Sequence, residues 1–303
     1  MSWRSVFISK PAKLSLRDNA LFIKQECEIS VPLEDIAVVV IDCREVVITA
    51  PLLTALSQFG ATLVVCDEHF LPCGQLLPFS QHSRFLKMLS LQMTLSSEIK
   101  SILWQKIICQ KIYHQSFVLK CAGLDNLSQK LLTLSNEVKE NDSNRCEAHA
   151  AALYFPALFG NGFSRGIDTP VNIRLNYGYS IMRSAVARVL VAYGFLPTLG
   201  LWHKNELNAF NLCDDLMEVF RQIVDLEVYT QFVSGSLNDE FETPDKAQLV
   251  KLLNYEMIFQ NKKHSVLSAM EQMVKSLTAV FHHQNADFFR LPEISYANEC
   301  QYE

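Results

Sequence analysis

The sequence predicts an α+β protein, in which a β-rich N-terminal domain over residues 1–77 precedes a larger all-α catalytic domain. Apolar and polar residues alternate in short runs through the first 77 residues, as in strands. Pro72, Gly74 and Pro78 then interrupt this pattern, and a helical period replaces it. With 303 residues, of which 49% are apolar, the chain can bury a core in each part.

The N-terminal domain is expected to resemble a β-sandwich with one short helix. Asp18 and Asn19 form a turn signal between two alternating runs, and residues 36–41 (IAVVVI) are continuously apolar, as in a buried strand. Thr49 and Gly60 are typical of the start and end of a helix. No glycine-rich phosphate loop joins the first buried strand to this helix, which argues against a dinucleotide-binding fold. Strands are expected around residues 6–8, 14–16, 21–23, 29–31, 36–41 and 61–66.

The second domain is expected to be helical over residues 84–285, after a linker at residues 78–83. Ser97 before Glu98, followed by apolar residues at helical spacing, is its clearest helix start. The polar residues 286–303 are expected to form a flexible tail. The expected helices span residues 82–95, 97–121, 124–138, 144–159, 172–193, 206–232, 244–259 and 263–284.

Composition indicates a globular cytoplasmic protein. No apolar run is long enough to span a membrane, and the N-terminus lacks an apolar signal core. The nine cysteines are scattered, which is typical of reduced thiols. Cys66, His69 and Cys73 come close in sequence, but no fourth zinc ligand stands nearby, so we interpret them as residues that pack at strand ends.

Basic residues are concentrated in two segments of this acidic chain. Residues 81–123 hold six Lys or Arg and one acid, a net +5, and residues 151–205 hold five and one, a net +4. Since the whole chain carries −5, the remainder carries −14. Such segments can line a phosphate-binding face, although ordinary solvated helix faces produce the same pattern.

Glu147, His203 and Glu218 are candidate metal ligands, because carboxylates and imidazoles bind divalent cations. Each also has an ordinary explanation. Glu147 follows Asn144 by three residues, the spacing of a helix-capping pair. His203 could satisfy a backbone carbonyl in a loop, and Glu218 precedes Arg221 by three residues, as in a surface ion pair. Spacing alone leaves both interpretations open.

Three phrases of the sequence, taken in order, resemble a known family. They are CEAHAAALYF, which contains Glu147, a stretch from LNYGYS to GLWH, which ends at His203, and DDLMEVFR, which contains Glu218. With IAVVVID and VVCDEHFLPCGQLLP in the first domain, they are similar to the CRISPR-associated integrase of the spacer-adaptation machinery. The likeness covers nearly the whole chain and is greatest to the branch found with type II systems.

The resemblance implies a metal-dependent DNA endonuclease and integrase of adaptive immunity against phages and plasmids. Such an enzyme joins the 3′-hydroxyl of a prespacer to a phosphodiester of the CRISPR repeat, by transesterification. The resemblance makes Glu147, His203 and Glu218 the catalytic metal ligands, with Asp215 as a supporting acid. Many family members have aspartate where Glu218 stands, and the longer side chain retains the charge. Two carboxylates and one imidazole suit Mg²⁺ or Mn²⁺.

The resemblance also implies macromolecular partners. These are double-stranded DNA (prespacer and repeat), a second copy of the chain bound through the β half, a smaller adaptation protein that completes a heterohexamer, and the type II effector nuclease. In this context the basic segments become candidates for phosphate contacts, and Tyr177 for stacking on a DNA end, although Tyr177 could equally pack between helices. The candidate DNA-binding residues are Arg84, Lys87, Arg165, Arg174, Asn176, Tyr177, Arg183 and Arg188.

Two other functions remain open from the sequence. One is a structure-selective DNA repair nuclease, which would cleave branched DNA without a partner protein or a repeat. The other is a non-catalytic DNA-holding subunit, in which the acidic residues only shape the fold.

Overall fold

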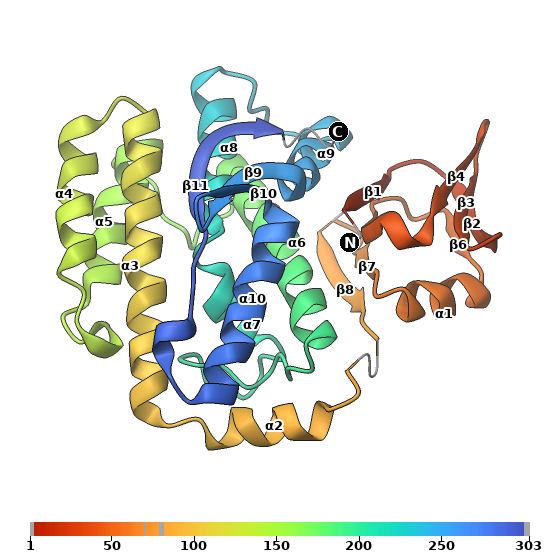
Figure 1. The fold of residues 1–303 in the computed structure, drawn as a ribbon. Helices are drawn as coiled ribbons and strands as arrows, with labels where there is room; N and C mark the ends of the chain where they lie inside the picture. The colour runs from red at the N-terminus through yellow and green to blue at the C-terminus, as the bar shows by residue number, and fades with distance from the viewer. Residues whose placement is uncertain (1–2, 70, 79–81, 300–303) are drawn as a thin grey trace.

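The N-terminal part of the chain forms two sheets of four strands each, and most of the remainder is helical (Figure 1). The structure is a computed structural model that describes residues 3–69, 71–78 and 82–299. The predicted α+β class is therefore confirmed. In Figure 1 the β domain lies to the right of the helices, and α1 closes its lower side.

In the first sheet, β1, β5 and β7 are parallel and β8 is antiparallel, in the order β1-β5-β7-β8. The second sheet has the order β4-β3-β2-β6. The β-domain elements are β1 (Arg4–Ile8), β2 (Ala12–Arg17), β3 (Ala20–Lys24), β4 (Glu28–Pro32), η1 (Leu33–Asp35), β5 (Ile36–Ile41), β6 (Val46–Ile48), α1 (Ala50–Gln58), β7 (Thr62–Cys66) and β8 (Pro72–Leu76).

The predicted turn and helix positions of the β domain are confirmed, although the Thr49 side chain makes no capping hydrogen bond. Asp18 and Asn19 have φ angles of 48° and 56° and connect β2 to β3, as a tight hairpin requires. Thr49 precedes α1, and Gly60 follows it with a φ of 70°. Two strands were not predicted: β6 has only three residues, and β8 begins at Pro72, which we had taken as part of a break.

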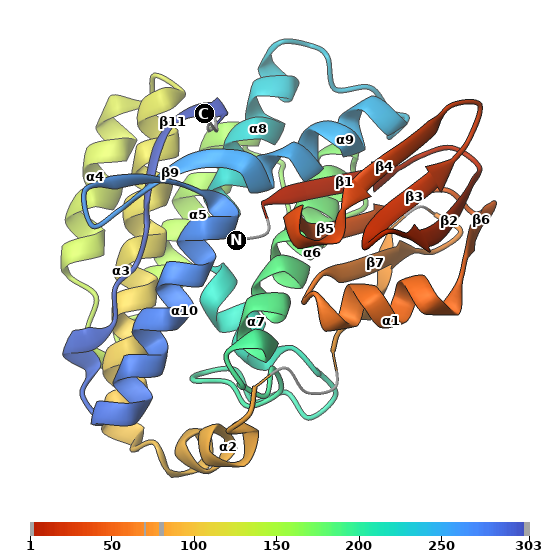
Figure 2. The same cartoon turned by 45° about the vertical axis from the view of Figure 1, so that its right-hand side comes forward.

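Strand β5 contributes side chains to the hydrophobic cores of both parts of the molecule. This is possible because successive side chains of a strand point to opposite faces. Val39 and Ile41 belong to the core of the β domain, whereas Val38 and Val40 belong to the larger core of the helical part. Helix α6 packs against β7 and β8 on one side and against α8 and α10 on others, so it lies centrally (Figure 2).

The helical part begins with α2 and is organised around two long helices, α3 and α6. Its elements are α2 (Phe85–Thr94), α3 (Ser97–Cys121), α4 (Asp125–Asn136), η2 (Glu140–Asp142), α5 (Cys146–Phe159), α6 (Pro170–Ala192), α7 (Asn211–Met217), α8 (Arg221–Val233), α9 (Thr243–Lys251), η3 (Leu252–Asn254), β9 (Tyr255–Phe259), β10 (Lys262–Ser265), α10 (Val266–His283), η4 (Ala286–Phe288) and β11 (Glu293–Glu299).

The prediction that the second domain is entirely helical is wrong. It contains an antiparallel sheet in the order β10-β9-β11, which replaces the end of the predicted helix at residues 244–259 and the start of the one at 263–284. Gln260 and Asn261 have φ angles of 49° and 62° and turn the chain between β9 and β10. Met257 and Phe259 are buried at a two-residue interval, as in a strand.

Two further predictions need correction. The expected helix at residues 206–232 is two helices, α7 and α8, separated at residues 218–220. The expected flexible tail is wrong for residues 286–299, which form η4 and β11, and residues 300–303 lie outside the described residues. Of the predicted linker, residues 79–81 also lie outside them. Among the described helices, none combines the length and apolar character needed to cross a membrane.

Candidate active site

Asp215 organises the loop that carries His203. Its buried carboxylate accepts hydrogen bonds from the backbone N–H groups of Leu201, Trp202 and His203 at 2.6, 3.0 and 3.1 Å. It also contacts His203 Nδ1 at 2.6 Å. A glycine is required at position 200, because a Cβ there would lie 2.3 Å from the His203 carbonyl oxygen and 2.9 Å from Asp215 Oδ2. The predicted supporting acid is therefore a positioning residue whose oxygens are already engaged.

His203 is held from two sides. The hydrogen bond that the imidazole donates to Asp215 raises the pKa of His203 above its ordinary value, against the effect of partial burial. The ring also meets the edge of Trp104, with centroids 5.6 Å apart. Trp104 is buried and stacks nearly parallel on Trp202, at a centroid distance of 5.4 Å. The histidine thus has a fixed orientation, and Nε2 lies on the ring edge opposite Asp215.

Glu147 lies in the first turn of α5, whose N-cap residue, Arg145, makes no side-chain capping hydrogen bond. The Asp142 carboxylate accepts hydrogen bonds from the N–H groups of Cys146 and Glu147 at 2.7 and 3.1 Å. Asn144 instead contacts the backbone of Lys139 and residue 137, so the alternative reading of Glu147 as its capping partner is wrong. Asp142 therefore satisfies the N–H groups at the start of α5. The Glu147 side chain is not needed for capping and is available for another role.

Glu147 and Glu218 converge on one cationic atom that we did not predict, the ammonium of Lys111 on α3. Lys111 Nζ lies 2.5 Å from Glu147 Oε1 and 2.7 Å from Glu218 Oε2. Glu218 Oε1 accepts a hydrogen bond from Arg221 Nε at 3.0 Å, as its sequence spacing suggested. Glu218 is only 5% exposed, however, so this is a buried ion pair and not a surface one.

In this cluster, neighbouring charges and burial shift the pKa values of Glu218 and Lys111 in opposite directions. Burial alone would raise the pKa of Glu218, but Arg221 and Lys111 hold it at about 2. Burial alone would lower the pKa of Lys111, but Glu218 and Glu147 raise it. Glu218, Lys111 and Arg221 are therefore charged at neutral pH.

The structure brings Glu147 and Glu218 to one ammonium, and Glu218 contributes to the raised pKa of His203. The residues come from α5, the end of α7 and the preceding loop. No three His, Cys, Asp or Glu side chains in the described ranges gather as a metal cage. Cys66 and Cys73 lie on the adjacent strands β7 and β8, consistent with packing.

Two of the predicted DNA-binding residues, Arg174 and Tyr177, are buried, and a third, the half-buried Arg188, binds within the protein. Arg174 is fully buried, and its guanidinium binds Asp245 at 2.8 Å and a backbone carbonyl at residue 240. Tyr177 is also fully buried and packs against Phe241, so the helix-packing interpretation is correct. Arg188 donates to the carbonyl oxygen of Gly60 at 2.6 Å, which joins α6 to the end of α1. The sequence pattern correctly predicts that these residues lie on a helix. It does not show which face of that helix is buried.

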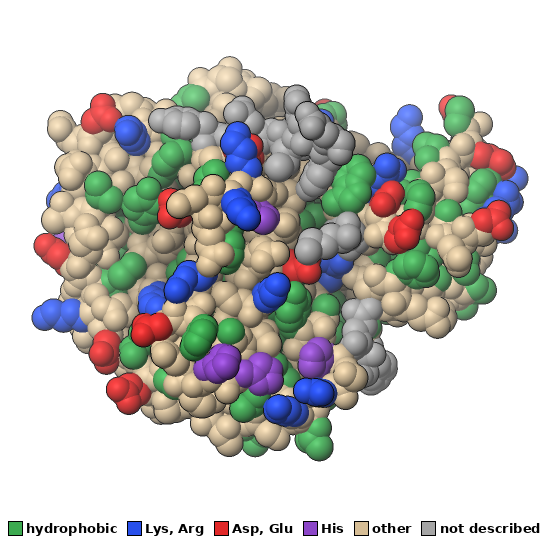
Figure 3. Space-filling view, in the orientation of Figure 1, with side chains coloured by type: hydrophobic (Ala, Val, Ile, Leu, Met, Phe, Trp, Pro, Cys, Tyr) green, Lys and Arg blue, Asp and Glu red, His purple; other side chains and the backbone are tan. Residues whose placement is uncertain are grey.

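The other predicted DNA-binding residues reach the surface. Arg84 and Lys87, on or beside α2, are exposed and lie near three histidines, His82, His282 and His283. Histidines gather beside basic residues near the lower end of α10 in Figure 3. Three further residues are partly or fully exposed on or near α6: Arg165 and Asn176, which contact each other at 2.8 Å, and Arg183.

Comparison with known proteins agrees with the resemblance seen in the sequence. A family model described as CRISPR associated protein Cas1 matches residues 6–258. The chain belongs to the Cas1 family. A CRISPR-associated endonuclease Cas1 from Neisseria meningitidis serogroup C is 48% identical over the full length of both chains, in agreement with the type II branch. A Cas1 endonuclease from Francisella tularensis subsp. novicida is 26% identical, over 58% of this chain and 63% of the relative.

Solved structures share the Cas1 fold. A Cas1 protein from Thermotoga maritima superposes with a TM-score of 0.72 at 18% identity, over 92% of this chain and 97% of the other. A casposase bound to its integration product superposes with a TM-score of 0.75 at 19% identity, over 94% and 92%. At such identities the similarity establishes the Cas1 fold and leaves the chemistry to the residues of the site.

Proposed function

We propose that this Cas1-family chain is a divalent-metal-dependent DNA endonuclease and integrase that inserts new spacers into a CRISPR array. The observation that supports it best is the convergence of Glu147 and Glu218 on one cation position. The third candidate ligand, His203, is held by Asp215. The full-length relative named as an endonuclease supports the same reaction class.

The donor groups fit a hard divalent cation. Glu147 and Glu218 each direct a carboxylate oxygen to within 2.7 Å of the same ammonium, so both can reach a single cation. Asp215 engages Nδ1 of His203, as carboxylates commonly do for metal-binding histidines, and Nε2 is the nitrogen for a metal. Mg²⁺ or Mn²⁺, held by Glu147, His203 and Glu218, would stabilise the charge that develops on the phosphoryl oxygens.

The neighbouring residues prepare the site for this chemistry. Asp215 holds the histidine with its proton on Nδ1, which leaves the lone pair on Nε2. The positive charge of Arg221 keeps Glu218 ionised. This favours metal binding, since a protonated carboxyl binds metals poorly. The nucleophile is the 3′-hydroxyl of the incoming DNA, so no side chain need form a covalent intermediate. The exposed residues that would bind DNA phosphates are Arg84, Lys87, Arg165, Asn176 and Arg183.

The proposal includes an assembly in the cytoplasm. The chain forms a homodimer through its β domain, and two homodimers flank a dimer of the small adaptation protein. A structural neighbour is a complex that contains Cas1 and Cas2, and another is bound to an integration product, which supports a Cas2-like partner and a DNA substrate. The type II effector nuclease is a further partner during spacer selection.

The test is a joining assay with purified protein, its small partner, a prespacer duplex with free 3′-hydroxyls and repeat DNA, in Mn²⁺ or Mg²⁺. Glu147→Gln and His203→Ala are each expected to reduce joining about 100-fold or more, because each removes a ligand at the reacting phosphate. Glu227→Gln is the control, since that carboxylate lies on α8 and contacts Gln231. Parental joining by both site variants would show that these residues are not catalytic.

The same preparation separates the two alternative functions. A repair nuclease would cleave branched DNA without the small partner and without preference for the repeat. A DNA-holding subunit would bind DNA but show no metal-dependent strand joining or cleavage, and Glu147→Gln would leave its affinity unchanged.

A further inference from the structure

Lys111 occupies the space between the two carboxylates of the candidate active site. Its side chain is 12% exposed and extends from α3, whereas Glu147 lies on α5 and Glu218 ends α7. The ammonium contacts one oxygen of each carboxylate, at 2.5 and 2.7 Å. The second oxygen of Glu218 is taken by Arg221 at 3.0 Å. The oxygen that faces Lys111 is therefore the one available to any other cation.

We propose that Lys111 is an internal cation that holds the site together without metal and competes with a divalent ion for Glu147 and Glu218. The inference rests on the proposed function, because it concerns the same ligands. It assigns Lys111 a positioning role: its ammonium sets the separation of the two carboxylates before a metal enters.

Electrostatics supports this exchange. Two ionised carboxylates that approach one point repel each other unless a cation lies between them, and burial strengthens the repulsion. An ammonium and a divalent ion at contact distance of the same oxygens would repel each other as well. Metal binding therefore requires Lys111 to withdraw, which its flexible four-carbon stem allows.

A matched lysine on the same helix provides the control. Lys106 is also partly buried, and its ammonium donates a hydrogen bond to the carbonyl oxygen of Ala286 at 2.7 Å. Lys106→Met removes the same charge from α3 without removing a partner of Glu147 or Glu218. Any effect of losing a lysine from this helix in general will therefore appear in Lys106→Met.

The experiment measures Mn²⁺ affinity, from the electron paramagnetic resonance signal of free Mn²⁺, and the melting temperature in EDTA and in saturating Mn²⁺. Lys111→Met is expected to melt lower than the parent in EDTA, to bind Mn²⁺ about tenfold more tightly, and to gain more in melting temperature from Mn²⁺. Lys111→Arg, which keeps the charge, is expected to bind Mn²⁺ no more tightly than the parent. Lys106→Met is expected to have parental Mn²⁺ affinity.

Mn²⁺ affinity in Lys111→Met equal to or weaker than that of the parent would overturn the inference. A Lys111→Met protein that folds only with Mn²⁺ would support it, and one that stays unfolded in saturating Mn²⁺ would contradict it. Failure of the proposed function has a different signature. In that case Glu147→Gln joins DNA normally, whatever the Mn²⁺ affinity of Lys111→Met.

Discussion

At the scale of single residues, the most consequential contact is the one between Asp215 and the loop at residues 201–203. One buried carboxylate satisfies three backbone N–H groups and the Nδ1 atom of His203. Hydrogen bonds to an ionised acceptor are stronger than neutral ones, so this carboxylate fixes both the loop and the ring. The orientation of His203 is thus set before any substrate binds.

Asp215→Asn is expected to lower the free energy of unfolding by about 2–4 kcal/mol and to reduce strand joining. An amide has one acceptor oxygen in place of two, and its NH₂ group faces donors that then have no acceptor. Urea unfolding measures the first effect and the joining assay the second. Asp214→Asn is the control, because Asp214 lies on the same helix at 3.9 Å from Arg183 and should change stability by less than about 1 kcal/mol.

At the residue scale, the sequence predicts the three candidate metal ligands but not Lys111. The motif resemblance selected Glu147, His203 and Glu218, and the structure shows Glu147 and Glu218 on one ammonium and His203 on Asp215. Lys111 could not be selected, because it is one of four lysines along α3 and no local pattern distinguishes it. Its role depends on which elements pack against that turn of the helix, and the local pattern does not contain this information.

At the scale of elements, buried His114 on α3 connects the break between α7 and α8 to the C-terminal strand β11. Its Nδ1 lies 2.8 Å from the carbonyl oxygen of Val219, and its Nε2 accepts from the N–H of Ile294 at 3.2 Å. Gln110 also donates to Nε2, at 2.9 Å. A carbonyl on one side and donors on the other require a neutral ring with its proton on Nδ1.

This ring makes the fold sensitive to acid. Burial lowers the pKa of His114 to about 4, from 6.5. Between these values the unfolded chain binds a proton that the folded chain does not, so stability falls as the pH falls through that range. His114 should contribute a loss of about 2 kcal/mol between pH 7 and pH 5. Urea unfolding of the parent and of His114→Gln measures it.

The quantity to compare between the two proteins is the change in free energy of unfolding from pH 7 to pH 5. The absolute values also differ because His114→Gln alters packing. The variant should lose about 2 kcal/mol less than the parent on acidification. An equal loss in both proteins would assign the acid sensitivity to other groups.

Among the elements, helices with a clear start were predictable and the C-terminal sheet was not. The Ser96 side chain caps α3 by accepting from the N–H of Ile99, and the expected bounds 97–121 agree with those observed. Strand β9, in contrast, is only five residues long and follows α9 after a single turn of 3-10 helix. In the sequence its apolar residues therefore look like a continuation of the preceding helix. Its pairing with β11 joins residues far apart in sequence.

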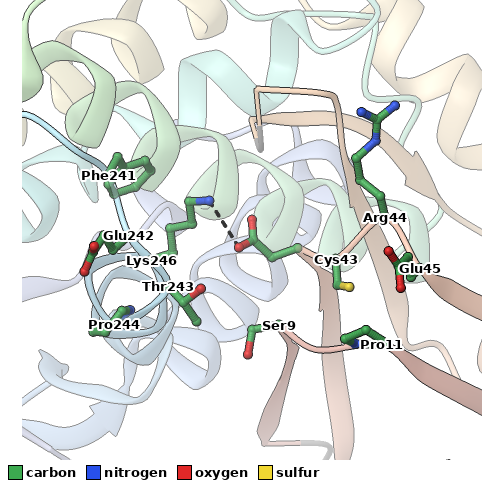
Figure 4. Close-up of a pocket in the computed structure, with 11 residues that line it drawn as sticks. Ser9, Pro11, Cys43, Arg44, Glu45, Phe241, Glu242, Thr243, Pro244 and Lys246 are labelled. Atoms are coloured by element: carbon green, nitrogen blue, oxygen red, sulfur yellow. Dashed lines mark hydrogen bonds and ion pairs between the residues drawn. The ribbon is translucent and has the colours of Figure 1, made fainter.

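At the scale of the whole molecule, a buried ion pair joins the β domain to the helical part. Lys246 Nζ on α9 lies 3.2 Å from Asp42 Oδ2, which follows β5, and both residues are only 4% exposed. The pair lies beside a cleft of about 660 Å³ that is lined from both sides (Figure 4). Burial raises the pKa of Asp42 even though Lys246 opposes that effect. The pair therefore fixes how α9 meets the β domain.

Lys246→Met is expected to lower the free energy of unfolding by about 3 kcal/mol, because it leaves the Asp42 charge buried without its cation. The double variant Lys246→Met with Asp42→Asn should recover part of this loss, since it removes that charge as well. Urea unfolding of both proteins measures the difference. A double variant less stable than the single one would show that the charge is not the cause.

The DNA-binding proposal also concerns the whole surface. Arg84→Ala and Arg183→Ala are each expected to weaken DNA binding and to reduce the salt slope of the binding constant by about 0.9, the contribution of one phosphate contact. Affinity measurements at several salt concentrations give this slope. An unchanged slope would place these side chains outside the DNA-binding face.

Arg174→Met is the matched comparison. Because the Arg174 guanidinium is buried against Asp245, this variant should lose stability but keep the parental salt slope. A reduced slope would mean that the chain rearranges on DNA and exposes this arginine.

The residues of the candidate active site, from Lys111 to Arg221, all belong to the helical part, and the β domain contributes none of them. The side chains proposed for the reaction and the surface proposed to join two copies of the chain therefore lie on different parts of the molecule. With the proposed homodimer contact on the β domain, substitutions on its outer surface would change association and leave the proposed metal ligands unaltered.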